Sequence, residues 1–150
     1  MEELQDDVKY SFIDKESDLY DQAVELRYKE FFEAFNRPKE SLFDEIEDKS
    51  IRVVACVNGK VIGHARLFIE NSTGDISQVV VDKDYRRMKV GIGIVNVLLN
   101  TAAEKNVKLM GLDSRVYATN FYKTFGFTTI GDIFESKKTG LPHIRMIKEM

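Results

Sequence analysis

The chain has 150 residues, of which 43% are hydrophobic and 31% charged, and this composition fits one globular domain with its own core. Twenty-two basic and 25 acidic residues give a net charge of −3, so no overall positive field favours nucleic acid. No apolar run reaches the roughly 18 residues of a membrane span, and the N-terminal stretch lacks a signal-peptide core. The lone Cys56 argues against a disulfide framework or a cysteine metal site. We therefore expect a single domain, residues 1–150, that is cytoplasmic and binds no membrane, nucleic acid or metal.

The first half of the chain predicts a strand, two helices and a hairpin. Ser17 or Asp18 can cap the first helix, which should end before Pro38. Asn58-Gly59 is the strongest short hairpin signal, because both turn positions need a positive φ. The predicted elements are a strand at 9–14, a helix from about 18, a short amphipathic helix at 40–48, and strands at 51–57 and 61–69.

The second half predicts one β-α-β crossover followed by a helix and two strands. Gly126 should end the last helix as its C-cap. A right-handed crossover brings two parallel strands together near the N-terminus of the helix, where open α/β sheets bind ligands. The fold class is therefore α/β, a mixed sheet with helices on it. The predicted elements are a turn at 71–74, strands at 76–81 and 107–112 around a helix at 91–105, a helix at 117–125, and strands at 127–134 and 143–147.

The turn between strand 76–81 and helix 91–105 predicts an anion site. Gly91 and Gly93 carry little bulk, and a turn of this kind that opens a helix leaves backbone N–H groups free to point at an anion. Arg86, Arg87 and Lys89 add three positive charges to the same short stretch of an acidic chain. We expect a phosphate site here, and specifically one for a pyrophosphate. Taken without its flanking elements, the same turn could simply be basic and solvated.

These residues, in this order, resemble the GNAT N-acetyltransferases, and among them the ElaA-like branch. The resemblance covers most of the chain and rests on order more than on any one motif. It implies a GNAT-like, mostly antiparallel sheet of six to seven strands with a central crossover and flanking helices. The matching pieces are Leu26-Arg27, the run Arg86 to Gly91, Asn120-Phe121-Tyr122, Phe125-Gly126-Phe127, and the run Gly140 to Met146.

The turn at residues 86–93, which is expected to bind phosphate, departs from the family pattern and allows two registers. If Arg86 fills the Arg/Gln position of the motif, Lys89 replaces its first glycine and Gly91 holds the second. If Gly91 and Gly93 are the glycine pair, Met88 replaces the Arg/Gln. We prefer the first register, in which Lys89 can add a phosphate contact.

The resemblance implies that acetyl-CoA is the cosubstrate and that Tyr122 serves as general acid for the departing thiolate. A phenol with an ordinary pKa of about 10 is a neutral donor at pH 7. Packing on the core is the alternative role for Tyr122, and a helix cap is the alternative for Asn120. The residues expected to bind the cofactor are Val79, Val80, Val81, Arg86, Arg87, Met88, Lys89, Val90, Gly91, Ile92, Gly93, Asn120 and Tyr122.

Arg27, Gln78 and His143 are expected to border the acceptor pocket. An ion pair of Arg27 with Glu25 or Glu30, and a strand-end role for His143, are the alternatives. Strand alternation places Gln78 on one face with Ile76 and Val80. The cluster Phe31, Phe32 and Phe35 is expected in the core. Several groups could take the proton of the amine, and none is preferred: Glu70, Asp75, a water on Gln78, Asp113, and His64, which fits a structural role better.

The function expected is transfer of the acetyl group of acetyl-CoA to a primary amine, by direct attack in a ternary complex. The amine could belong to a small molecule, a peptide or a protein. The alternatives are transfer of another acyl group, an acyl-CoA sensor without turnover, and a nucleotide-binding regulator. The last is disfavoured because no Gly-Lys-Ser/Thr sequence follows the turn. A homodimer through the C-terminal strands is a further expectation.

Overall fold

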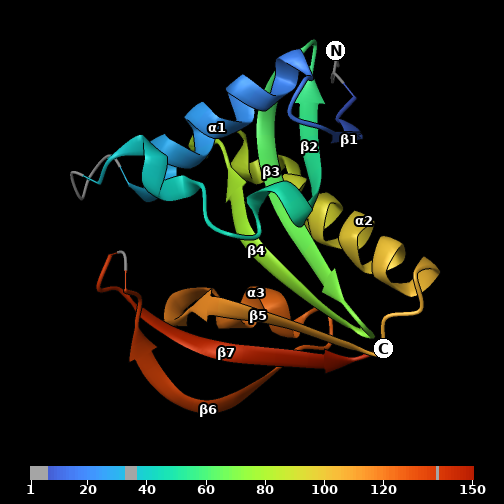
Figure 1. Ribbon diagram of the computed structural model, residues 1–150, viewed down its shortest axis with the longest axis vertical. Helices are drawn as coiled ribbons and strands as arrows, with labels where there is room; N and C mark the ends of the chain where they lie inside the picture. The colour runs from blue at the N-terminus through green and yellow to red at the C-terminus, as the bar shows by residue number, and fades with distance from the viewer. Residues whose placement is uncertain (1–6, 33–36, 138) are drawn as a thin grey trace.

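A computed structural model describes residues 7–32, 37–137 and 139–150 as one seven-stranded sheet with helices on both faces (Figure 1). The strand order is β1-β2-β3-β4-β5-β7-β6, and only β4 and β5 run parallel to each other. The predicted α/β class and mostly antiparallel sheet are therefore confirmed. Within these ranges, no helix is long and apolar enough to cross a membrane. The strands are β1 (Lys9–Ile13), β2 (Ile51–Val57), β3 (Lys60–Glu70), β4 (Thr73–Val81), β5 (Leu109–Arg115), β6 (Thr128–Glu135) and β7 (Pro142–Glu149), and the α-helices are α1 (Asp18–Phe31), α2 (Val90–Glu104) and α3 (Thr119–Lys123).

Local signals in the sequence set several of these boundaries. The Ser17 hydroxyl accepts a hydrogen bond from the Leu19 amide at 3.1 Å and caps α1, as predicted. Asn58 and Gly59 have φ angles of 50° and 80°, and they join β2 to β3 as a hairpin. Gly126 has a φ of 95°, but the C-cap of α3 is Thr124, two residues earlier, so the expected C-cap at Gly126 is wrong.

Two predicted helices are wrong in extent. The segment 40–48 forms two 3₁₀ turns instead of an amphipathic helix, η2 (Lys39–Leu42) and η3 (Glu47–Lys49). The side chain of Glu47 turns inward to a cluster of buried arginines, and these tertiary ion pairs override a helical path. The segment 117–125 is a 3₁₀ turn, η5 (Val116–Ala118), followed by the five-residue α3.

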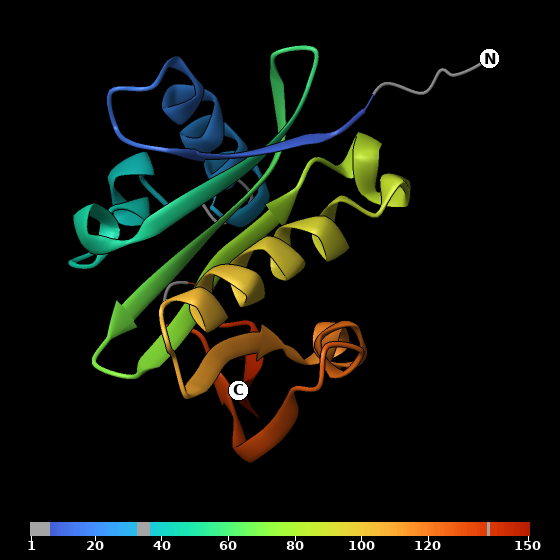
Figure 2. The ribbon, with the colours of Figure 1, turned by 90° about the vertical axis from the view of Figure 1, so that its right-hand side faces the viewer.

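The helices α1 and α2 cover opposite faces of the sheet (Figure 2). The main core lies under α2, and a smaller core lies under α1. Residues fully buried in the main core include Val53, Ile94, Leu98 and Met110. The core under α1 is built around Ala23, Leu26 and Val54. Each helix thus buries an apolar stripe on the sheet. This packing fixes the C-terminal end of α1 and the N-terminal end of α2 beside β4.

The strands β4 and β5 separate before they end. Their parallel ladder runs only from Thr73–Leu109 to Ile76–Leu112, and beyond it β5 diverges from β4 (Figure 1). A β-bulge lies at this point, where Gln78 and Val79 together oppose one residue of β3. Gln78 has a φ of 55°. The bulge reverses the side-chain alternation, so Ile76 faces the core under α2 whereas Val80 faces the core under α1. The expectation that both share one face is therefore wrong.

Candidate active site

The separation of β4 from β5 opens a cavity of about 690 Å³. Its walls come from the end of α1, the last residues of β4, the start of α2, the C-terminal end of β5 with α3, and the segment leading into β7. The structure brings together here ten of the residues singled out from the sequence: Gln78, Val79, Val80, Val81, Arg86, Lys89, Gly91, Ile92, Tyr122 and His143.

The start of α2 supplies open backbone N–H groups to this cavity. The first turn bond of the helix runs from the Gly93 amide to the Lys89 carbonyl at 3.2 Å, so the amides of Val90, Gly91 and Ile92 precede any intrahelical partner. Lys89 is the N-cap and has left-handed angles, φ 59° and ψ 28°. This conformation favours glycine, which supports the register that places Lys89 at the first glycine position of the motif.

An ion pair of Arg86 connects the turn before α2 to the C-terminal end of α1. Its Nη2 lies 2.9 Å from the Glu30 carboxylate, and its Nε donates to the Val81 carbonyl at 3.4 Å. The ion pair is partly exposed, and both partners line the cavity. Arg86 and Lys89 thus place positive charge at the N-terminus of α2, where the helix dipole already favours an anion.

Other residues of the expected cofactor set do not line the cavity. Val90 is fully buried in the core, and Met88 packs partly against it. Gly93 faces β1, because a Cβ at this position would overlap the Tyr10 ring. Asn120 is exposed on α3. The side chain of Arg87 lies outside what the structure describes.

The Tyr122 side chain reaches the cavity from α3 and is only 9% exposed. Its ring makes edge contacts with Phe121 at 5.0 Å and Phe127 at 6.2 Å between centroids. Burial, with a smaller contribution from Tyr117, raises the pKa of Tyr122 to about 12. The hydroxyl therefore stays protonated at neutral pH and can donate a hydrogen bond or a proton into the cavity.

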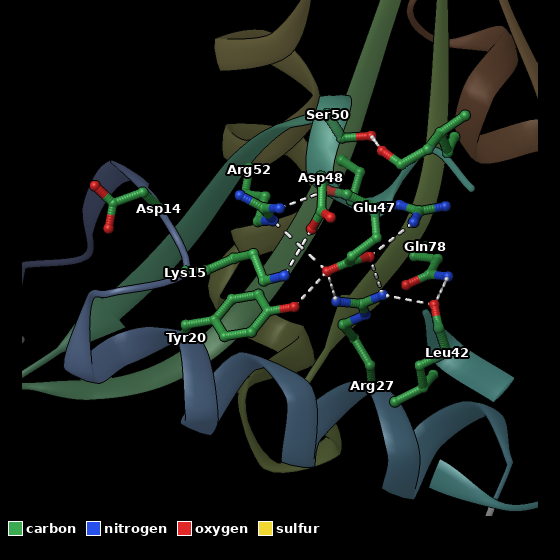
Figure 3. Close-up of polar contacts among 12 residues, drawn as sticks. Asp14, Lys15, Tyr20, Arg27, Leu42, Glu47, Asp48, Ser50, Arg52 and Gln78 are labelled. Atoms are coloured by element: carbon green, nitrogen blue, oxygen red, sulfur yellow. Dashed lines mark hydrogen bonds and ion pairs between the residues drawn. The ribbon is translucent and has the colours of Figure 1, made fainter. Parts of the chain in front are cut away.

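Arg27 lies away from the cavity, fully buried between α1 and the turns η2 and η3 (Figure 3). Its Nη1 and Nη2 donate to the Glu47 carboxylate at 2.9 and 2.8 Å, and Nη2 also donates to the Leu42 carbonyl at 3.1 Å. The alternative expectation, an ion pair of Arg27 with Glu25 or Glu30, is therefore wrong. Leu42 also accepts a hydrogen bond from Gln78 Nε2 at 3.3 Å, so this buried cluster fixes the Gln78 side chain at the edge of the cavity.

Glu47 is the centre of that cluster. It accepts hydrogen bonds from Arg27, from the Tyr20 hydroxyl at 2.7 Å and from Arg66 at 2.8 Å. Burial alone would raise the pKa of Glu47, but the hydrogen bonds from Arg27, Tyr20 and Arg66 outweigh it and hold the pKa well below its usual range. Glu47 is therefore an ionised structural group and no proton acceptor for the reaction.

The candidate bases named from the sequence lie in three different parts of the molecule. Asp113 lines the cavity and accepts from Arg145 Nη1 at 3.2 Å. Glu70 and Asp75 lie in a second, smaller hollow of about 300 Å³, where Asp75 pairs with Arg145 at 2.6 Å. His64 is fully buried, its Nδ1 is 3.0 Å from the Val53 carbonyl, and burial lowers its pKa to about 3.

The sequence did not reveal several residues of the cavity wall. Phe31 was expected in the core but lines the cavity, where the Arg115 guanidinium lies 5.9 Å from its ring. Phe32 touches the cavity and is otherwise buried, and Phe35 lies outside the described residues. Arg115 and Ser136 also line it, and they come from a strand end and a loop that carry no motif.

Comparisons with known proteins agree with this geometry. A family model described as "Acetyltransferase (GNAT) domain" matches residues 15–150. The chain is 29% identical over 140 residues to a protein of Bacillus subtilis (strain 168) whose name gives it as a candidate acetyltransferase, covering 91% of this chain and 93% of that one. It is 26% identical to ElaA of Escherichia coli (strain K12) over 111 residues, 71% of each chain.

Solved structures agree with these sequence matches. The crystal structure of Escherichia coli ElaA superposes with a TM-score of 0.80 at 23% identity and covers 95% of this chain and 99% of that one. An aminoglycoside 6'-N-acetyltransferase complexed with coenzyme A superposes with a TM-score of 0.76 at 17% identity over 94% and 96% of the two chains. The fold of this chain is thus shared with known acetyltransferases, and with the family match along nearly its whole length, the chain belongs to the GNAT acetyltransferase family.

Proposed function

We propose that the protein transfers the acetyl group of acetyl-CoA to a primary amine by direct attack in a ternary complex. One observation supports this above all others. The open amides at the start of α2, the unpaired edge of β4 and the Tyr122 hydroxyl all belong to one cavity. An anion site, a strand edge and a proton donor in that order suit a long cofactor that ends in a thioester.

The cofactor would lie along the wall formed by β4 and α2. Its pyrophosphate would accept hydrogen bonds from the amides of Gly91 and Ile92, with charge from Lys89 and from Arg86. Its pantetheine arm would pair with residues 79–81 of β4, whose ladder to β5 has already ended. The aminoglycoside 6'-N-acetyltransferase that was solved with coenzyme A shares this fold, which supports coenzyme A as the ligand.

The chemistry would need little beyond positioning and proton transfer. The amine attacks the thioester carbonyl while both substrates are held together, and backbone amides of β4 polarise the carbonyl oxygen. Tyr122 then protonates the departing thiolate, or donates a hydrogen bond to it. Cys56 is buried in β2, and burial raises the pKa of its thiol, so a covalent acyl-enzyme at this residue is not proposed.

Calorimetry with acetyl-CoA tests the proposal on four proteins. Wild type should bind, and Gly91→Glu should not, because its carboxylate would occupy the anion site. Asn96→Glu is the matched control, since it adds the same charge to an exposed position further along α2 and should bind normally. Tyr122→Phe should bind nearly as well as wild type but transfer acetyl to amines at least tenfold more slowly.

Three results would contradict the proposal. If the wild-type protein binds no CoA ester, the proposed acetyl transfer is excluded, and only the assignment of the fold remains. Equal loss of binding in Gly91→Glu and Asn96→Glu would show that the start of α2 is not the anion site. Tight binding without turnover on any amine would instead favour an acyl-CoA sensor.

A further inference from the structure

We propose that His143 is the general base that removes the proton from the acceptor amine. This inference rests on the proposed acetyl transfer. Primary alkylamines are protonated at neutral pH, and an ammonium nitrogen has no lone pair to attack a thioester. The cavity must therefore hold a group that can accept a proton, directly or through one water.

Among the described residues that line the cavity, three side chains could accept a proton: Glu30, Asp113 and His143. Both carboxylates are engaged with arginines, Glu30 with Arg86 at 2.9 Å and Asp113 with Arg145 at 3.2 Å. Each carboxylate thus already accepts a hydrogen bond from an arginine and is held against it. This leaves the imidazole as the group best suited to take the proton.

The position of His143 fixes which nitrogen is available. Its Nδ1 lies 2.9 Å from the Leu141 carbonyl oxygen, which can only accept a hydrogen bond. Nδ1 therefore carries the hydrogen, and in the neutral ring Nε2 holds the lone pair. The ring also stacks on Phe134 of β6, with centroids 6.1 Å apart and an interplanar angle of 30°. The hydrogen bond and the stack thus hold the imidazole in place at the wall of the cavity.

Several charged and titratable groups surround His143 and belong in any interpretation of its pH dependence. Arg115 is its Cα partner on β5, and the Arg115 guanidinium donates to the Tyr117 hydroxyl at 3.2 Å. The others come from the flanking positions of β5, β6 and β7, and they are Asp113, Glu135 and Arg145.

The proton balance of the reaction then closes. The ammonium gives one proton to Nε2 of His143, which later releases it to water. The amine lone pair forms the C–N bond, and the C–S bond breaks with its electron pair on sulfur. The thiolate takes the proton of the Tyr122 hydroxyl. The nitrogen of the new C–N bond still carries one proton more than the amide needs, and this proton passes to the Tyr122 phenolate and restores the phenol. The products are an amide, coenzyme A and one proton in solution.

A modification experiment tests the state of His143 without knowledge of the acceptor. The chain has only two histidines, and His64 is fully buried. Diethylpyrocarbonate, which reacts with unprotonated imidazole nitrogen, should therefore modify one histidine per chain, at His143. Proton–nitrogen NMR of the imidazoles should show His143 as the Nδ1–H tautomer. A tautomer protonated at Nε2, or a His143 that resists the reagent, would overturn the proposal.

Kinetics with probe amines tests the role itself. Wild type and variants are assayed with acetyl-CoA and spermidine, tyramine or a lysine-containing peptide, and separately with hydroxylamine, which is unprotonated at neutral pH. His143→Asn keeps an amide nitrogen near the position of Nδ1 but has no basic Nε2, and His143→Gln keeps a polar atom near Nε2. Both should lower kcat/KM for alkylamines by about 10²- to 10⁴-fold and change the rate with hydroxylamine only a few-fold.

The pH profile distinguishes His143 from Asp113, the other candidate for the general base. In wild type, kcat/KM for an alkylamine should rise as the pH increases, because a protonated imidazole cannot accept the proton of the amine. His143→Asn should lose this rise and Asp113→Asn should keep it. The reverse pattern would assign the base to Asp113 and overturn the proposal. If wild type acetylates no amine at all, the proposed function fails instead, and the base proposal fails with it.

Discussion

Replacing Glu47 by alanine should be among the most destabilising single changes in this protein. The carboxylate is 4% exposed and receives hydrogen bonds from Arg27, Arg66 and Tyr20 (Figure 3). Its removal leaves the buried guanidinium groups of Arg27 and Arg66 without the counter-charge that they share.

The expected magnitude follows from the cost of breaking a buried ion pair. Removing one partner of such a pair costs about 3–5 kcal/mol, because the other charge stays buried without compensation. For a domain of this size, that loss should lower Tm by roughly 6–20 °C. Asp48→Asn is the matched control: this neighbour of Glu47 pairs only at the surface, with Lys15, and should change stability by about 1 kcal/mol or less.

Urea unfolding at pH 7 measures both variants, and a pH series tests the mechanism. The pKa of Glu47 is lower in the folded chain than its ordinary value of 4.5, so its stabilising contribution is complete above pH 4.5 and is lost as the pH falls below it. Glu47→Ala should lack this acid-dependent part. A Glu47→Ala protein within about 0.5 kcal/mol of wild type would refute the view that the cluster stabilises the fold.

Three further predictions concern stability and assembly. The pKa of His64 falls from 6.5 to about 3 on folding, so the unfolding free energy should fall by up to ~1.4 kcal/mol per pH unit as the pH drops from 6.5 toward 3, and His64→Leu should lack this slope in urea titrations. Gly93→Ala should cost about 1–3 kcal/mol by displacing the Tyr10 ring, and it should be nearly neutral in a Tyr10→Leu background; an equal cost in both backgrounds would exclude the clash. The edge strand β6 exposes Ile133 and Phe134, so we expect a homodimer that Ile133→Lys dissociates, and a monomer mass for wild type by light scattering would reject it.

Most of the fold could be predicted because its signals are local. Asn58-Gly59 sets a hairpin by the conformation of two residues, and Ser17 caps α1 by one hydrogen bond. The segment 40–48 could not be predicted this way. Its path depends on Glu47 meeting arginines from α1 and β3, which lie far away in the sequence. A tertiary ion cluster leaves no periodic pattern within the segment itself.

The candidate site could be predicted where a motif marks it and not where the strands separate. The turn at Lys89 and Gly91 and the aromatic run at Tyr122 have fixed spacing, and the structure places them in one cavity. By contrast, one bulge at Gln78 moves every later side chain of β4 to the other face. An inserted residue of this kind has no signature here, because Gln78 is not glycine, the residue that marks many bulges.

The separation of β4 from β5 also explains why the sequence did not point to His143, the base proposed above. The sequence offered Glu70, Asp75, a water on Gln78, Asp113 and His64 as candidate bases, and it placed His143 only at the border of the acceptor pocket. Because β4 bends away from β5 after Ile76, the groups that face the end of β4 come from β5, α3 and the segment entering β7. His143 is distant in sequence from the turn before α2, and this separation leaves both on the wall of one cavity. A base on β7, opposite a cofactor held by β4 and α2, would take the proton of an amine that enters from the side of the cavity that the cofactor leaves open.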